Sequence, residues 1–193
     1  MKRGTMIAGL VTALACGAMI KLGLWQLQRA DWKNGLIARY ASAKSLPEMA
    51  YPTTPDPKDL PLFRRAAGLC KSVTGATAVA GRSPTGQTGW SHIVTCGSGA
   101  EGPGMTVDIG WSRKPDNPVW KGGPVSGVIG QDPKALIRLI SAKPLAPGLE
   151  PSQPPSIEEI PNNHFGYAIQ WFLFAGIAAV IFLIAAFYRQ RSP

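Results

Sequence analysis

The 193-residue chain has few of the residue types from which enzymes and metal centres are built. It contains three cysteines and two histidines, with no CxxC pair and no cluster at zinc-ligand spacing. It also lacks a P-loop, a nucleophile elbow, a dinucleotide fingerprint and an HExxH helix. We therefore expect a protein that is not an enzyme, in which any metal chemistry depends on His92 or His164.

Charged residues are also scarce, at 16% of the chain, although the formal net charge is +9. Four of the basic residues lie at the two ends of the chain: Lys2, Arg3, Arg189 and Arg191. The rest of the sequence has no run of lysine or arginine and no basic platform with interleaved aromatics. This pattern argues against nucleic acid as a partner.

Two long apolar runs lie near the termini, at residues 6–25 and 167–188. The first contains one charge, Lys21, and the second contains none. A run of about 20 apolar residues matches the ~30 Å hydrocarbon core of a bilayer. Both runs are predicted to be transmembrane helices. A cleaved signal peptide is the alternative for the first run, but the run continues to Trp25, past the A-x-A-like site.

The remaining segments follow from these two spans. The basic ends, 1–5 and 189–193, are predicted to be cytoplasmic tails, so the region between the spans is extracytoplasmic. This gives an N-in/C-in protein of the bacterial inner (plasma) membrane, or of the mitochondrial inner membrane if the source is eukaryotic. Between the spans we expect an amphipathic helical extension, a proline-rich connector and a mainly β domain, at 26–46, 47–61 and 62–161.

The middle domain has short apolar runs between glycine and proline punctuation. These runs predict strands at 62–74, 76–81, 89–95, 105–111 and 125–129. Asp132 and Pro133 resemble the cap and first residue of a helix, which predicts one short helix after them. The predicted fold class is membrane α+β, with two transmembrane helices flanking a small barrel or sandwich that contains one short helix.

Cysteines and small residues suggest further contacts. Cys70 and Cys96 form a disulfide candidate if the domain faces an oxidising compartment, and two buried thiols are an equal alternative. Small residues at four-residue spacing predict close packing of the two spans. These rows are Gly9, Ala13 and Gly17 in the first span, and Ala175 and Ala179 in the second.

His164 lies where the second span begins. On a helix it shares a face with Tyr167, Ala168, Trp171 and Ala175. An axial haem ligand needs a neutral imidazole, and a haem with a lipophilic tail needs an apolar slot beside it. The pattern suits both needs, while a histidine in the usual Tyr/Trp interfacial belt is the alternative. His92 lies in a predicted strand, where we expect an ordinary hydrogen-bonded histidine.

Four blocks of the sequence resemble those of the Surfeit-locus (Shy-type) family of cytochrome c oxidase assembly factors. The most specific block is 162–172, which resembles the family's NxHxxYAxxWF signature, and 22–29 with Lys33 resembles the motif that ends its first span. Two weaker blocks, at 89–92 and 107–111, occur in the same order. The chain departs from the family's Asn-Arg-Gly-Trp-Val-Pro run, because it has Asp108-Ile109-Gly110-Trp111-Ser112-Arg113 instead.

The resemblance implies a chaperone of the respiratory chain that binds haem a and assists the maturation of the oxidase core subunit. Its partners would be that core subunit, haem-synthesis or other assembly proteins, and membrane lipid. His164 carries over as the haem iron ligand, and the other cofactor-site candidates are Tyr167, Trp171, Trp25, Gln26 and Arg29. The alternatives are a haem-free scaffold or accessory subunit of the oxidase, and a two-span envelope protein unrelated to respiration.

Overall fold

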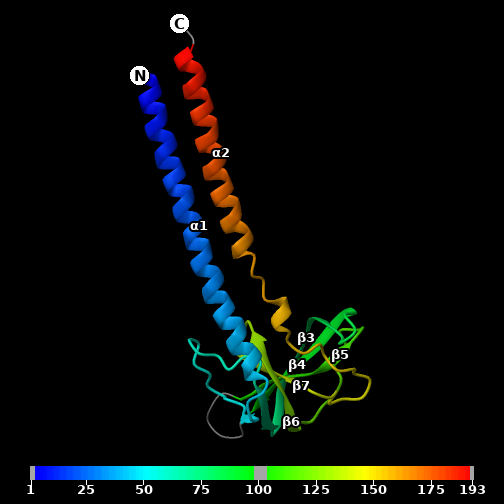
Figure 1. The fold of residues 1–193 in the computed structure, drawn as a ribbon. Coiled ribbons are helices and arrows are strands. Elements are labelled where there is room, and N and C mark those ends of the chain that lie inside the picture. Colours follow the sequence, from blue (N-terminus) through cyan, green and yellow to red (C-terminus); the bar gives the residue numbers. More distant parts are fainter. Residues whose placement is uncertain (1–2, 98–103, 192–193) are drawn as a thin grey trace. The chain divides into compact units, whose positions relative to one another are not determined.

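The computed structural model describes residues 3–97 and 104–191, with side chains described up to Arg189. The chain divides into two compact units. One unit is Met1–Ile37 with Pro161–Pro193, and the other is Ala38–Ile160. The first unit is helical and the second is a β domain (Figure 1).

The helical unit is built from α1 (Arg3–Ala43), which continues into the second unit, and α2 (His164–Arg191). Both helices are long and apolar enough to cross a membrane. In Figure 1 they lie side by side and run in opposite directions. Most of their large apolar side chains are exposed, as expected for helices that face lipid tails rather than a protein core.

The contact between the helices repeats every seven residues. On α1, the contact positions are Gly9, Cys16, Gly23 and Ala30. On α2, they are Ala168, Ala175 and Phe182. A seven-residue repeat is typical of helices that wrap around each other with a left-handed twist.

The predicted row of small residues is therefore only partly correct. Gly9 does face α2, but a Cβ at Gly17 would have no neighbour within 4 Å, and Ala13 is exposed. The four-residue row drifts around the helix, whereas the seven-residue positions stay on the side that faces α2.

The β domain contains one seven-stranded mixed sheet in the order β1-β2-β6-β7-β5-β4-β3. Its strands are β1 (Met49–Ala50), β2 (Arg65–Cys70), β3 (Ser72–Arg82), β4 (Thr88–Gly97), β5 (Thr106–Ser112), β6 (Gly123–Asp132) and β7 (Leu136–Ser141). A 3-10 helix, η1 (Ile157–Glu159), lies in the proline-rich segment after the sheet. Most neighbouring strands pair antiparallel, but β5 pairs with β7 in parallel and β1 with β2 in parallel.

The sheet is strongly curled, as the distance between its two disulfide-bonded cysteines shows. Cys70 on β2 and Cys96 on β4 are four strands apart in the sheet order, which would be about 19 Å in a flat sheet. Their Cα atoms are 5.2 Å apart and their sulfurs are bonded. Lys71 alone separates β2 from β3, which belong to opposite ends of the order. The sheet is therefore rolled like a barrel, and the disulfide that the sequence left open is formed.

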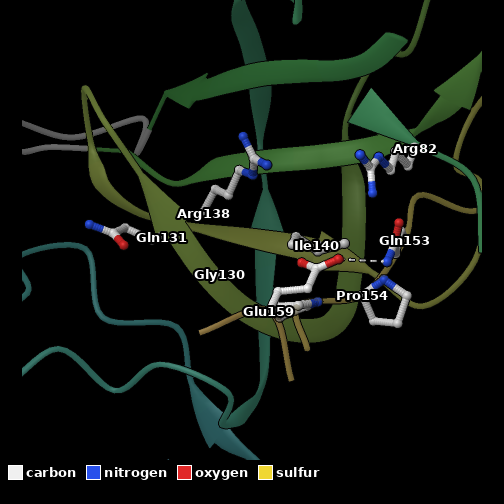
Figure 2. A pocket seen from close by; sticks show the side chains of 9 residues that line it. Arg82, Gly130, Gln131, Arg138, Ile140, Gln153, Pro154 and Glu159 are labelled. Atoms are coloured by element: carbon white, nitrogen blue, oxygen red, sulfur yellow. Dashed lines mark hydrogen bonds between the residues drawn. The ribbon is translucent and has the colours of Figure 1, made fainter. Parts of the chain in front are cut away.

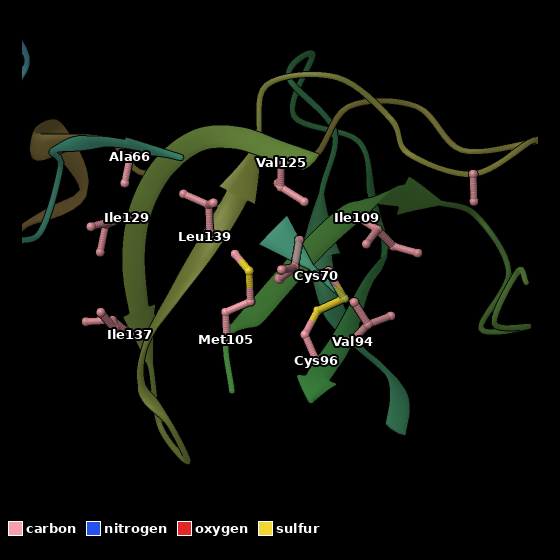
Figure 3. Packing of buried hydrophobic residues seen from close by; sticks show 12 residues of the cluster. Ala66, Cys70, Val94, Cys96, Met105, Ile109, Val125, Ile129, Ile137 and Leu139 are labelled. Carbon is pink, nitrogen blue, oxygen red and sulfur yellow. A yellow bond between two sulfur atoms is a disulfide. The ribbon is translucent and has the colours of Figure 1, made fainter. Parts of the chain in front are cut away.

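The apolar core fills the inside of this curled sheet (Figure 3). One side of each strand contributes to it, as the alternation of side chains along a strand requires. Its most buried members include Val107, Ile109, Ile129, Ile137 and Leu139. Burial of these five side chains stabilises the domain by roughly 1.5–3 kcal/mol each.

The prediction of a short helix after Asp132 is wrong. Residues Leu136–Ser141 form β7, which pairs antiparallel with β6. The Asp132 carboxylate does accept hydrogen bonds from the N–H groups of Lys134 and Ala135, at 2.9 and 2.8 Å. Such an Asp-Pro start serves a tight turn as well as a helix cap. Here it closes a three-residue hairpin loop, and Leu136 has the positive φ of 67° that such loops need at their end.

The last part of α1 packs within the β domain unit. The ring of Tyr40 lies 4.8 Å from that of Phe63, and Ala43 is buried. Arg39 forms an exposed ion pair with Asp59. The helix thus continues beyond the apolar run, as its sequence periodicity predicted, and ends at Ala43.

Candidate functional site

His164 is the first residue of α2, and its imidazole contacts a glutamine of α1. The Nδ1 atom of His164 lies 2.7 Å from Oε1 of Gln26. Both side chains are partly buried. Two of the predicted site residues, 138 positions apart in sequence, therefore meet directly.

This contact sets the tautomer of the neutral imidazole. An amide oxygen only accepts hydrogen bonds, so the Nδ1 atom must carry the proton and donate it. In a neutral imidazole the lone pair then lies on Nε2. A histidine that binds a metal uses this arrangement, with one nitrogen held by a hydrogen bond and the other left for the metal.

The two helices approach each other closely next to the His164–Gln26 pair. A Cβ added to Gly23 would lie 2.6 Å from the ring of Phe172, so this close contact requires a glycine. Further along, the Cys16 thiol donates to the carbonyl of Ala175 at 3.4 Å. Ala168, one turn after His164, is 1% exposed. Small residues therefore bring the backbones together and hold His164 and Gln26 within hydrogen-bonding distance.

A second polar contact lies near the first. The Asn162 Nδ2 group donates to Oδ1 of Asn34 at 2.7 Å, which links the residues before α2 to α1. The Oδ1 atom of Asn162 is buried and has no hydrogen-bond partner among the described residues. A buried acceptor in this state is suited to a donor from water or from a bound group.

The other candidate residues are exposed or have other aromatic partners. Trp25 and Tyr167 are each 49% exposed. The guanidinium of Arg29 stacks on the ring of Trp32, 4.8 Å from its centroid. Trp171 contacts Phe174 edge to face, with centroids 6.3 Å apart. Of the face predicted from His164, Tyr167, Ala168, Trp171 and Ala175, the two alanines are buried and Tyr167 is exposed. Phe172, which lies outside that predicted face, contacts α1 at Gly23.

Sequence reasoning missed the two inter-helix hydrogen bonds. Gln26 was named as a cofactor-site candidate without a partner, and Asn34 was not named. The available signal was the position of polar amides on the first helix just beyond its apolar run, at the level where the second helix starts. In antiparallel helices those two levels coincide, so each amide needs a partner there.

His92, the second histidine, has a structural role. It is 1% exposed, its Nδ1 lies 3.0 Å from Oδ1 of Asn117, and its Nε2 lies 2.8 Å from the Ser112 hydroxyl. Both ring nitrogens therefore have polar partners inside the β domain. Among the described residues there is no group of three or more His, Cys, Asp or Glu side chains that could hold a metal ion.

Comparison with protein families gives the identity of the chain. A sequence model described as the SURF1 family matches residues 13–176, which include most of α1, the whole β domain and the first part of α2. The chain belongs to the SURF1 family. A search of curated proteins found no match to it.

Family membership places the molecule in respiratory-chain biogenesis. SURF1 proteins are assembly factors for cytochrome oxidase and not enzymes, and the family implies association with that oxidase. The two candidate spans and the disulfide-bonded domain indicate a membrane protein with an extracytoplasmic domain.

Proposed function

We propose that this SURF1 protein binds haem a through Nε2 of His164 and assists its insertion into the oxidase core subunit, or its stabilisation there. The observation that carries the proposal is the 2.7 Å hydrogen bond between His164 and Gln26. It leaves the imidazole with the lone pair on the nitrogen that points away from Gln26, which is the form that binds iron.

The donor set fits a haem. A single histidine with an oriented ring is a common axial ligand, and the bound haem would supply the redox-active iron that the oxidase needs. Around it, Trp25, Tyr167 and Trp171 offer aromatic surface on the exposed flanks of the helices. An apolar macrocycle with a lipophilic tail suits such a surface within a bilayer.

Arg29 is a candidate for a negatively charged group of the ligand. Its guanidinium carbon lies 4.8 Å from the centroid of the Trp32 ring, and a cation–π contact of this kind uses none of the five N–H groups of the guanidinium. A haem propionate or a lipid phosphate would pair with them. Stacking also orients the side chain, so that less conformational entropy is lost when it binds an anion.

Location and partners follow from the same proposal. We place both termini in the cytoplasm and the β domain outside a bacterial inner membrane, with a mitochondrial inner membrane as the equivalent in a eukaryote. The partners are the oxidase core subunit and the haem-synthesis or other assembly proteins that meet it in the membrane.

The test is the visible spectrum of the protein purified from cells that make haem a. Wild type should carry a Soret band, and His164→Ala should lose at least ~90% of it, because the iron loses its axial ligand. His92→Gln is the matched control, since it removes the other histidine but can still hydrogen bond to Ser112 or Asn117. Full haem occupancy in His164→Ala, or loss in His92→Gln alone, would refute the assignment.

The same preparation distinguishes haem binding from the alternative function. A haem-free scaffold or accessory subunit should co-purify with oxidase subunits whether or not His164 is present, and should show no haem band. That result would keep the assembly role and remove haem binding from it.

A further inference from the structure

The outer face of the curled sheet has a groove that the function proposed above does not use. Two cavities, of about 610 and 570 Å³, lie on the side of the strands opposite to the apolar core. Arg138 on β7 lines both of them. The two cavities therefore adjoin at Arg138, and together they are called the groove below.

One wall of the groove is the edge strand β3. Five residues of β3 line the smaller cavity: Gly75, Ala76, Thr77, Val79 and Ala80. Three of them are consecutive, so the strand presents its backbone to the cavity as well as its side chains. β3 is the last strand in the sheet order and pairs only with β4 among the described strands. Its other edge thus has backbone donors and acceptors that no strand of the sheet uses.

The hydrogen bonds identify which groups face outward. Ser83 donates its N–H to the carbonyl of Gln87 at 3.0 Å, so its amide faces the neighbouring strand. Backbone direction alternates along a strand, so Arg82, Ala80 and Ala78 face the free edge. The carbonyl of Arg82 indeed accepts a bond from the N–H of Gln153 at 2.8 Å. The chain itself therefore already uses the end of this edge as a pairing surface.

The edge lacks the features that usually prevent strand addition. β3 is 11 residues long, and residues 72–81 contain no charge and no proline. Natural proteins commonly protect a long free edge with lysine, proline or a covering segment. Among the described residues the covering contact stops at Arg82, and the small side chains before it leave room for another backbone.

The groove is suited to acidic groups. Three cations line it, namely Arg82, Lys134 and Arg138, against the carboxylates of Asp132 and Glu159. Figure 2 shows Arg82 and Arg138 on either side of Ile140, with Glu159 held by Gln153 at 3.0 Å. The Nη1 atom of Arg138 lies 3.7 Å from Asp132, but its Nε is buried and has no hydrogen-bond partner among the described residues. Such a donor is satisfied by an acceptor that enters from the groove.

A second carboxylate near Arg138, that of Asp108, is a weaker partner for the guanidinium than Asp132. Asp108 is buried on the same side of the sheet and accepts from the Ser152 hydroxyl at 2.6 Å. Its burial raises the pKa of the carboxyl above the ordinary value, against the lowering effects of Ser152 and Arg138. Burial thus disfavours the charged form of Asp108, which leaves Asp132 as the main partner of Arg138.

We infer that this groove binds an extended acidic segment of a partner protein, which adds a strand to the free edge of β3 and places a carboxylate against Arg138. Backbone pairing along β3 gives the affinity, and the cations select acidic side chains at alternate positions. The inference uses only residues of the β domain unit and does not depend on haem binding.

The test is a peptide-binding measurement on the full chain in detergent micelles, read by fluorescence anisotropy. The probe is a labelled seven-residue peptide of alternating valine and glutamate. Matched peptides replace glutamate by glutamine or lysine, and two further copies carry N-methyl groups on the valine or the glutamate amides. We expect the acidic peptide to bind tightest, and one of the two N-methylated copies to lose about tenfold in affinity, because only one set of amides faces β3.

Two pairs of variants test the two contacts separately. Ala80→Pro removes an outward N–H and should weaken binding by about tenfold, whereas Ala80→Val keeps the amide and should stay within about twofold. Arg138→Met should weaken the glutamate peptide by about tenfold and leave the glutamine peptide unchanged, while Arg138→Lys retains most of the preference. Circular dichroism of each variant checks that the domain is folded.

Three results would overturn the inference. They are equal binding of the lysine and glutamate peptides, equal binding of both N-methylated copies and the parent peptide, and complete displacement of the peptide by phosphate or citrate at a comparable concentration. The last result would assign the groove to a small anion. The measurements on N-methylated peptides use wild-type protein, so they decide the question even if Ala80→Pro does not fold.

Discussion

Gln26 accepts a hydrogen bond from Nδ1 of His164 across 2.7 Å, between two helices that the sequence separates by 138 residues. The bond joins the ends of the two family motifs into one site. It also explains why a glutamine follows the apolar run of the first helix, because its amide oxygen sets the tautomer of the histidine opposite. If His164 is the haem ligand proposed above, Gln26 is a positioning residue for it.

Loss of this bond should weaken haem binding without abolishing it. In Gln26→Leu the imidazole is free to rotate and to change tautomer, so we expect haem a affinity to fall by about 10–100-fold. Gln26→Glu keeps an acceptor and should retain affinity within about tenfold. Haem titration followed by the Soret band measures both. An affinity unchanged in Gln26→Leu would remove Gln26 from the site.

Close packing of the helices should depend on Gly23 and not on Gly17. In Gly23→Val the new side chain meets Phe172, whereas Gly17→Val meets nothing within 4 Å. We expect the first change to separate the helices and lower haem occupancy, and the second to have little effect. Disulfide cross-linking between cysteines placed on α1 and α2 reports the packing directly. Equal cross-linking in both variants would contradict the seven-residue contact pattern.

Asp108 should make the β domain less stable as the pH rises. Its folded pKa is raised by burial, so the native state binds its proton more tightly than the unfolded state does. Stability is then greatest below the ordinary pKa of the carboxyl and falls as the pH rises through the folded value. Asp108→Asn keeps an oxygen to accept from Ser152 and Gly110, and should raise the Tm at pH 8 by about 2–4 °C.

Measuring the Tm of both proteins over a range of pH checks that prediction. Because the wild-type carboxyl is protonated at low pH, the difference in Tm between wild type and Asp108→Asn should shrink as the pH is lowered toward 4. A difference that is constant from pH 4 to 8 would mean that charge is not the cause. Differential scanning fluorimetry on the full chain in detergent measures it.

Removal of the Cys70–Cys96 bond should destabilise the β domain strongly. The bridge joins residues 26 positions apart, which corresponds to about 3–4 kcal/mol in the chain-entropy account. The double change Cys70→Ser with Cys96→Ser should therefore unfold at much lower denaturant concentration than wild type. Mass spectrometry after alkylation gives the direct reading: unreduced wild type should label at Cys16 alone, and labelling at three positions would contradict the bridge.

The sequence predicted the parts of the fold that follow from local patterns. The two spans follow from apolar runs of a length that only lipid or a large core can cover, and the structure has a helix at each. The strands follow from runs broken by glycine and proline. The segment after Asp132 was wrongly predicted to be helical. An Asp-Pro pair can start either a turn or a helix with the same hydrogen bonds. Here the segment after the turn pairs with β6 and is therefore a strand.

The site could be predicted only in part, for a physical reason. His164 was singled out by the helical face that it shares with Tyr167 and Trp171, and by the resemblance of residues 162–172 to the family signature. Its contact with Gln26 depends on the register between two helices, which is set by Gly23, Phe172 and the other seven-residue contacts. The groove on the sheet could not be foreseen, since Arg138 lies in the segment predicted as a helix and meets β3 only through the curl of the sheet.

The central claim is that Nε2 of His164 binds the haem iron, and chemical rescue tests it most directly. His164→Gly should lose the Soret band of bound haem a, and added imidazole should restore it, because a free imidazole can occupy the space of the missing ring. The same treatment of His92→Gln should leave the Soret band unchanged, since that residue is hydrogen-bonded inside the β domain. Haem retained by His164→Gly without imidazole, with a spectrum like that of wild type, would contradict the account.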